Sequence, residues 1–376
     1  MPGPAKKGFL RRHAVKLVAS ALITIGVIYT VESGGLKLVP DGGDFAGVRW
    51  AALAAYFPLL FGMTWFRAVR WRFLLRQIIV VPKLRLFAVS CIGFFAMWAL
   101  PFRLGELARP LMLRTRPEEI KPGKPVLTLT AATGTIVAER VIDGLFISIV
   151  LAIALLTVPT LHPLPETVVG LKISVAHVRW AGFAMLGLFT TAFTVIAVFY
   201  FARTFAVRAT HVVFGLVSQQ LADKLSGMAS HLADGLHVFR SGRDFFGFLL
   251  ETAAYWMFNA AGMWVLARAC GVTHLDGSGI TFGEACALMG MLSCAILIPG
   301  PPGLLGVFQA GIYAGMTMYF PTAIVTGPGA AFVFLVYITQ VAFCLVTAAW
   351  GLWYEGGARR LQGVSLDERP LAGEPT

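Results

Sequence analysis

The chain has 376 residues, of which 57% are hydrophobic and 13% are charged, and its mean hydropathy is +0.75. A soluble domain carries about 25% charged residues, so this composition excludes a soluble globular protein and indicates a polytopic membrane protein. The net charge of +12 arises from basic residues at the ends of apolar runs. That pattern is typical of membrane orientation and contact with anionic lipid rather than of nucleic-acid binding.

The first apolar run, residues 14–31, follows a basic segment and is expected to be a retained helix that leaves the cytosol. The second run, residues 50–66, returns to a strongly basic segment. By the positive-inside rule this segment is predicted to lie in the cytosol, and its basic residues are Arg67, Arg70, Arg72, Arg76, Lys83 and Arg85.

Residues 86–113 are predicted to form a re-entrant helical hairpin. The apolar run 86–100 is shorter than the roughly 20 residues that cross a membrane, and a crossing here would carry many basic residues outside. A hairpin that enters from the cytosol and turns near Pro101 avoids both problems. Proline is tolerated in the first turn of the returning helix, and Gly105 would permit a close backbone approach.

A span at about 135–158 completes the first half, residues 1–160, and the same order of elements then recurs. The second half, residues 161–355, is predicted to contain a span at about 180–202, an amphipathic helix 212–239, a span at about 246–268, a hairpin at about 281–319 and a last span at about 330–353. This second hairpin is broken by prolines and glycines, namely Pro299, Gly300, Pro301, Pro302, Gly303 and Gly306.

These segments predict an all-α polytopic membrane protein with about six crossing helices and two re-entrant helical hairpins, arranged as two halves of inverted topology. Both termini are expected in the cytosol, and residues 356–376 are expected to form a disordered cytosolic tail.

Arg103, Glu106 and Arg109 are spaced by three and so share one broad face of the returning half-helix. Charged groups at membrane depth persist where they pair with one another or face a wet cavity. Because a guanidinium group matches phosphate geometry, we predict that these residues bind a lipid head group. The alternative is that they only hold orientation and pair with other side chains.

Further polar residues lie in or beside the apolar runs. Glu139 and Asp143 are four residues apart on one helix face, with Arg140 beside them. These three residues are predicted to belong to the same head-group site, where the carboxylates could neutralise Arg103 or Arg109 when substrate is absent. A polar path or a coupling role is a further possibility for Glu251, Glu284 and Gln309. The sequence contains no HExxH metal site, no GxSxG nucleophile and no aspartate-rich metal pair, and His231, Asp234 and His237 are interpreted as a solvated polar face, so no metal and no cofactor are expected.

Four stretches, "LPFRLGELARPLML", "AERVIDGLF", "LLETAAYWMFNAAGMWVLARACGV" and "LIPGPPGLLGVFQAG", occur in the order found in a known family. The chain resembles the transmembrane, flippase-like domain of the lysylphosphatidylglycerol synthase (multiple peptide resistance factor) family over most of residues 10–355. The resemblance implies movement of phospholipids, typically aminoacylated ones, across the bacterial cytoplasmic (inner) membrane. Only about twenty residues follow the last predicted span, so the family's soluble synthase activity is expected to be absent.

The leading hypothesis is therefore a non-enzymatic lipid flippase or scramblase whose partners are membrane phospholipids. One alternative is an intramembrane enzyme that acts on lipid phosphate or on a lipid-linked sugar. Another is a membrane partner of a separate lipid-modifying enzyme. A homo-oligomer is compatible with all three.

Overall fold

The computed structural model describes residues 38–76, 78–100, 105–113, 127, 129–169, 173–201, 241–297 and 302–361, with isolated positions between 208 and 227. Several predicted features therefore lie outside the described residues: the first span, residues 101–104, most of the amphipathic helix 212–239, Pro299–Pro301 and the tail beyond residue 361.

The described residues are helical and contain no strand; two isolated bridges, Thr167 with Ser174 and Thr273 with Gly279, close loops. The helices are α2 (Ala51–Val69), α3 (Trp71–Leu75), α4 (Lys83–Ala99), α5 (Ala108–Leu113), α6 (Leu129–Thr157), α7 (Val175–Phe201), α10 (Gly242–Ala269), α11 (Phe282–Ala295), α12 (Val307–Tyr319), α13 (Thr322–Thr326) and α14 (Pro328–Leu361), with short 3-10 turns η1 (Gly42–Phe45) and η4 (Pro302–Leu304).

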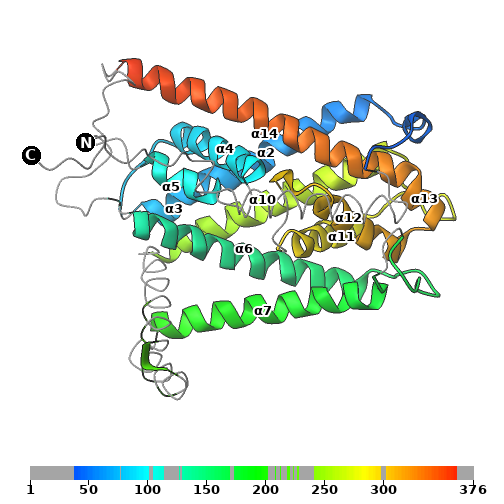
Figure 1. Cartoon of the computed structure of the whole chain (residues 1–376), viewed down its shortest axis with the longest axis horizontal. Coiled ribbons are helices and arrows are strands. Elements are labelled where there is room, and N and C mark those ends of the chain that lie inside the picture. Colours follow the sequence, from blue (N-terminus) through cyan, green and yellow to red (C-terminus); the bar gives the residue numbers. More distant parts are fainter. Residues whose placement is uncertain are drawn as a thin grey trace, which may run out of the picture.

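The long helices run roughly parallel to one another along the length of the molecule (Figure 1). Within the described residues, four segments are long and apolar enough to cross a membrane: Ala51–Leu75, Ala131–Thr157, Val175–Val195 and Pro328–Gly357. Helix α10 has 28 residues and packs along α2. It is less apolar than the four segments named above because charged residues lie at both of its ends and Glu251 lies within it.

Two pairs of shorter helices lie between the long ones. Helices α4 and α5 lie in the half of the molecule that also holds α3, whereas α11 and α12 lie in the other half, toward α13 (Figure 1). Helix α11 has 14 residues, so at 1.5 Å per residue it is about 21 Å long, short of the roughly 30 Å of a bilayer's hydrocarbon core. It packs tightly on α12, since a Cβ atom added at Gly311 would lie 2.7 Å from the Cβ of Ala295.

Each short pair packs on a long helix through a glycine. Helix α4 lies along α14, where a Cβ at Gly351 would come within 2.6 Å of the carbonyl oxygen of Ala88. Helix α11 lies along α6, where a Cβ at Gly290 would come within 2.7 Å of the Cβ of Leu151. Small residues of this kind let membrane helices approach closely.

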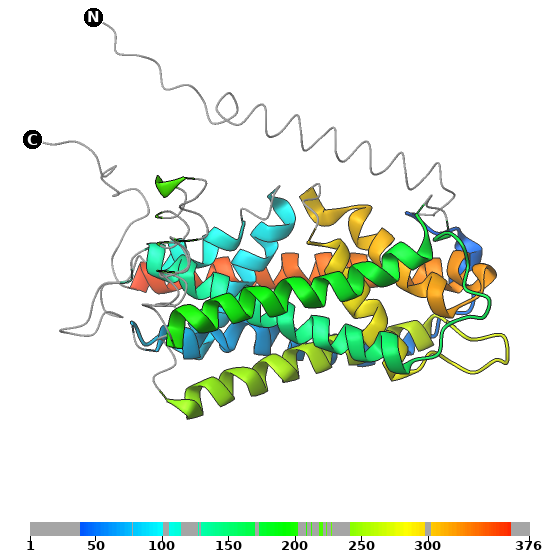
Figure 2. The same cartoon turned by 90° about the horizontal axis from the view of Figure 1, so that it is seen from below.

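The two short pairs meet in the middle of the molecule (Figure 2). Trp98 near the end of α4 packs against Phe308 at the start of α12, with ring centroids 5.8 Å apart, and both contact Tyr337 of α14. Beyond this meeting point, toward η1 and α13, the interior is a continuous apolar core built from α2, α6, α10, α11, α12 and α14.

Candidate functional site

A cavity of about 330 Å³ lies in the middle of the bundle, between the two short pairs and the long helices. Four charged side chains line it: Arg67 from α2, Glu106, and Arg140 and Asp143 from α6. Most of its remaining wall is apolar or aromatic, including Leu60, Met63, Phe94, Met97, Trp98, Ile147, Met185, Phe189, Trp256, Met289, Leu292, Ile296, Leu297, Leu304, Phe308 and Phe343. The cavity therefore combines a charged region with an apolar one, as an amphipathic ligand requires.

A network of buried ion pairs underlies the charged region. Arg70 donates to both oxygens of Asp143, at 2.5 and 2.6 Å, and to Glu139 at 3.0 Å. Glu139 also accepts from Arg109 at 3.2 Å and from Arg140 at 2.8 Å. Arg70 and Glu139 are fully buried and Arg109 is 2% exposed. Charges so far from water are stable only when paired and hydrogen-bonded.

The network lies deep in the bundle. Glu139 lies ten residues after Leu129, the first residue of α6. Thr252 accepts a hydrogen bond from Arg70 at 2.9 Å and lies ten residues after the first residue of α10. At 1.5 Å per residue, both helices place the network about 15 Å from their first residue.

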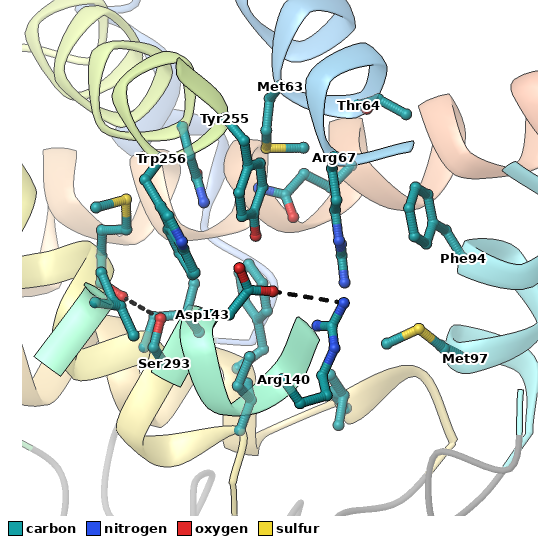
Figure 3. A pocket seen from close by; sticks show the side chains of 18 of the residues that line it. Met63, Thr64, Arg67, Phe94, Met97, Arg140, Asp143, Tyr255, Trp256 and Ser293 are labelled. Atoms are coloured by element: carbon teal, nitrogen blue, oxygen red, sulfur yellow. Dashed lines mark hydrogen bonds and ion pairs between the residues drawn. The ribbon is translucent and has the colours of Figure 1, made fainter. Parts of the chain in front are cut away.

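In the charged region of the cavity and the network beneath it, the arginines outnumber the carboxylates. Arg67 forms no ion pair with a described carboxylate; its guanidinium group lies over Phe94 at 4.3 Å and over Tyr255 at 5.7 Å. Its Nε atom is buried without a hydrogen-bond partner, as are Nε of Arg140 and both Nε and Nη2 of Arg109. In Figure 3 the ends of the Arg67 and Arg140 side chains point toward each other, while Asp143 forms an ion pair with Arg140 at 3.6 Å. Two facing guanidinium groups with spare N–H groups form a site suited to an oxyanion.

Residues 16–358, which include every residue of this site, match the family described as "Lysylphosphatidylglycerol synthase TM region". The chain belongs to this family. No curated protein and no solved structure matches the chain significantly. Family membership and the four long apolar helices together make it a multi-pass membrane protein.

Within this lysylphosphatidylglycerol synthase transmembrane region, the structure brings together five of the predicted head-group residues: Glu106, Arg109, Glu139, Arg140 and Asp143. The sixth, Arg103, lies outside the described residues, as does Pro101. A Cβ at Gly93 of α4 would lie 2.4 Å from Cγ of Arg109, so the absence of a side chain there leaves room for Arg109 to reach Glu139.

The three residues predicted for a polar path lie elsewhere. Glu251 is held by Arg72 through bonds of 2.5 and 2.8 Å. Glu284 accepts from the backbone N–H of Thr281 in the capping box that begins α11, and it lies 3.0 Å from His274. Gln309 accepts at 2.7 Å from the backbone N–H of Gly306. Each of these contacts holds a helix end or joins two helices, and none of the three side chains lines the cavity.

The predicted hairpin breaks have distinct backbone roles. Gly105 approaches α4 of its own pair, since a Cβ there would lie 2.1 Å from the carbonyl carbon of Ala96. In the second pair Pro302 begins η4, and Gly303 and Gly306 adopt φ values of +74° and +83° that favour glycine.

Sequence reasoning missed Arg67 and Arg70, because it assigned their segment to the cytosol. The structure shows that these side chains belong to the interior of the bundle: the apolar segment continues to Leu75, Arg70 is fully buried and Arg67 lines the cavity. The cytosolic location of the segment stays a prediction. Arg85 is likewise buried, 3.1 Å from Glu355. The available signal was the spacing of Arg67 and Arg70, which places both on the helix face that also carries Thr64 and Leu60.

Proposed function

We propose that the chain moves phospholipids across the membrane as a non-enzymatic flippase or scramblase, and that Arg67 and Arg140 hold the head-group phosphate. The observation that carries this proposal is the cavity itself, which has excess guanidinium groups in one region and apolar side chains over most of its remaining wall. A phospholipid has the same division, because a charged phosphate is joined to acyl chains.

Phosphate is the favoured anion for chemical reasons. Arginine presents a planar fork of N–H donors that binds phosphate oxygens in pairs, and it is less strongly hydrated than lysine. Arg67 has no described carboxylate partner, and Arg140 shares Glu139 with Arg70 and Arg109. A phosphate between Arg67 and Arg140 would relieve their mutual repulsion and satisfy N–H groups that otherwise lack partners.

Glu106 extends this proposal to the rest of the head group. Its Oε1 atom is buried without a hydrogen-bond partner, and its side chain lines the cavity. A carboxylate in that state favours an ammonium or hydroxyl group on the ligand. The family description refers to lysylphosphatidylglycerol, a lipid that carries both a phosphate and ammonium groups, so aminoacylated phospholipids belong among the substrates to be tested.

We also propose that residues 1–160 and 161–355 are inverted halves, each with a re-entrant hairpin, in a bacterial inner membrane with both termini in the cytosol. Reciprocal packing supports this arrangement. Exchanging α2 with α10, α4 with α11, α5 with α12 and α6 with α14 converts four packed pairs of the first half (α4 with α14, α2 with α4, α4 with α5, and α5 with α6) into packed pairs of the second. The packing of α4 on α14, for example, becomes that of α11 on α6.

The proposal is tested by measuring lipid movement in proteoliposomes with labelled anionic, zwitterionic and aminoacylated phospholipids and a membrane-impermeant quencher. Arg67→Gln is the informative variant, because it removes a guanidinium group without leaving a described carboxylate unpaired. Arg76→Gln is the matched control, since Arg76 is largely exposed and pairs with Asp244 away from the cavity.

We expect the wild type to move lipid fast. The rate in Arg67→Gln should be at least about tenfold lower, because a hydrogen bond from a charged group is removed, and the rate in Arg76→Gln should change little. Absence of movement of every lipid by folded wild-type protein would refute the proposed function. Equal rates for Arg67→Gln and wild type would refute the role of Arg67.

A further inference from the structure

A triangle of aromatic side chains lies where the two short helix pairs meet. Trp98 of α4, Phe308 of α12 and Tyr337 of α14 pack against one another with ring centroids 5.4 to 5.8 Å apart. Tyr337 meets both partners edge-on, at interplanar angles of 69° and 68°. The triangle therefore joins three helices that are otherwise distant in the sequence, through side chains rather than through the backbone.

This aromatic triangle stands between the cavity and the outer surface. Trp98 and Phe308 line the cavity; Phe308 is buried, whereas Trp98 and Tyr337 are partly exposed. Around them, Leu100, Leu297 and Ile338 are 42%, 43% and 41% exposed, on a surface that would face acyl chains. Leu297 both lines the cavity and reaches this surface. Among the described residues, Leu297 therefore connects the cavity with this surface.

A single hydroxyl group fastens the triangle to the turn that precedes α12. Tyr337 Oη donates to the carbonyl oxygen of Gly303 at 3.0 Å. That turn is conformationally strained, because Leu304 has a φ of +54°, which is uncommon for a residue with a side chain. Gly303 and Gly306, on either side of it, also have positive φ. Strained turns of this kind persist where neighbouring contacts hold them and change conformation when those contacts are lost.

We propose that Trp98, Phe308 and Tyr337 form a lateral gate through which acyl chains pass between the bilayer and the cavity, and that the Tyr337 hydroxyl holds this gate closed. This inference rests on the proposed function, because it assumes that the ligand of the cavity is a lipid. It adds the route of entry, which neither the arginine site nor the family membership specifies.

The test compares Tyr337→Phe with wild type in full-length protein reconstituted into phosphatidylcholine and phosphatidylglycerol vesicles. Tyr337→Phe keeps the ring packing and removes only the hydroxyl group. Tyr354→Phe is the matched control, because Tyr354 lies on the same helix, stacked on Trp350.

A phosphatidylglycerol with a photoreactive acyl chain reports on access directly. After irradiation, labelling of the cavity residues Met289 and Leu292, which are 2% and 7% exposed, is divided by labelling of the outward residues Leu345 and Val346, which are 52% and 66% exposed. We expect this ratio to rise about fivefold in Tyr337→Phe, the effect of one neutral hydrogen bond on an opening equilibrium, and to stay unchanged in Tyr354→Phe.

The labelling ratio does not depend on lipid transport, so the gate and the flippase function are tested independently. A raised ratio in Tyr337→Phe with no lipid movement by wild type would support the gate and refute the flippase. An unchanged ratio would overturn the gate, whatever the transport rates.

Discussion

Arg70 and Asp143 are joined by two parallel hydrogen bonds, from Nη1 to Oδ1 at 2.5 Å and from Nη2 to Oδ2 at 2.6 Å, although 73 residues separate them in the chain. Arg70 is fully buried and Asp143 is 5% exposed. This pair fixes the end of α2 against α6, and it leaves Arg67, one turn earlier on α2, directed into the cavity.

The Arg70–Asp143 pair should therefore be essential to stability. Asp143→Asn leaves a buried guanidinium group without its main carboxylate, which is expected to cost about 3–5 kcal/mol of unfolding free energy. The melting temperature in detergent should fall clearly. Asp244→Asn, which breaks the surface pair with Arg76, should cost about 1 kcal/mol or less. Similar losses in the two variants would contradict the structural importance of the buried pair.

Glu139 is expected to be the carboxylate that neutralises the arginines of the site when no anion is bound, since it contacts Arg70, Arg109 and Arg140. Glu139→Gln removes that negative charge, so the variant should melt at a lower temperature in buffer without phosphate. Inorganic phosphate should then raise its melting temperature more than that of wild type, because an added anion replaces the missing charge. The same rise with chloride at equal ionic strength would show general screening and not a phosphate site.

Gly93 should be required for the position of Arg109. Gly93→Ala places a Cβ 2.4 Å from Cγ of Arg109, so the Arg109 side chain must move away from Glu139, at an expected cost of about 1–3 kcal/mol. Lipid movement should decrease as well. Gly187→Ala on α7 is the matched control, because a Cβ there meets nothing within 4 Å. If Gly93→Ala transports and melts as Gly187→Ala does, the packing argument for Arg109 is wrong.

The proposed orientation predicts which loops face outward. Leu275, in the loop between α10 and α11, is 84% exposed, whereas Arg76 lies beside the first turn of α10 at the opposite end. A membrane-impermeant maleimide should label Leu275→Cys in intact cells and should label Arg76→Cys only after permeabilisation. Unsubstituted protein, with its five native cysteines, gives the background. The reverse pattern would invert the proposed topology.

Much of the fold follows from local patterns. Apolar runs with charged ends predicted helices close to α2, α6, α7, α10 and α14, because a chain in hydrocarbon must satisfy its backbone hydrogen bonds within each segment. Proline and glycine runs indicated the breaks beside α5 and before α12 for the same local reason.

The arginine site was only partly predictable. Glu139 and Asp143 could be placed on one helix face from their spacing, but no spacing reveals which arginines face them. Arg67 and Arg70 looked like orientation signals, since positive charge at the end of an apolar run usually marks the cytosolic boundary. The burial of Arg70 depends on carboxylates 69 to 73 residues away.

The sequence by itself therefore determined that this protein is a helical, multi-pass membrane protein, where most of its helices lie, and which side chains are too costly to leave unpaired in lipid. Only the tertiary structure decided which charges pair, that Arg67 remains without a described carboxylate partner, and that Trp98, Phe308 and Tyr337 meet. The physical reason is distance along the chain. Helix formation is a local matter of periodicity and backbone hydrogen bonding, whereas a buried charge network is formed by residues brought together from several helices.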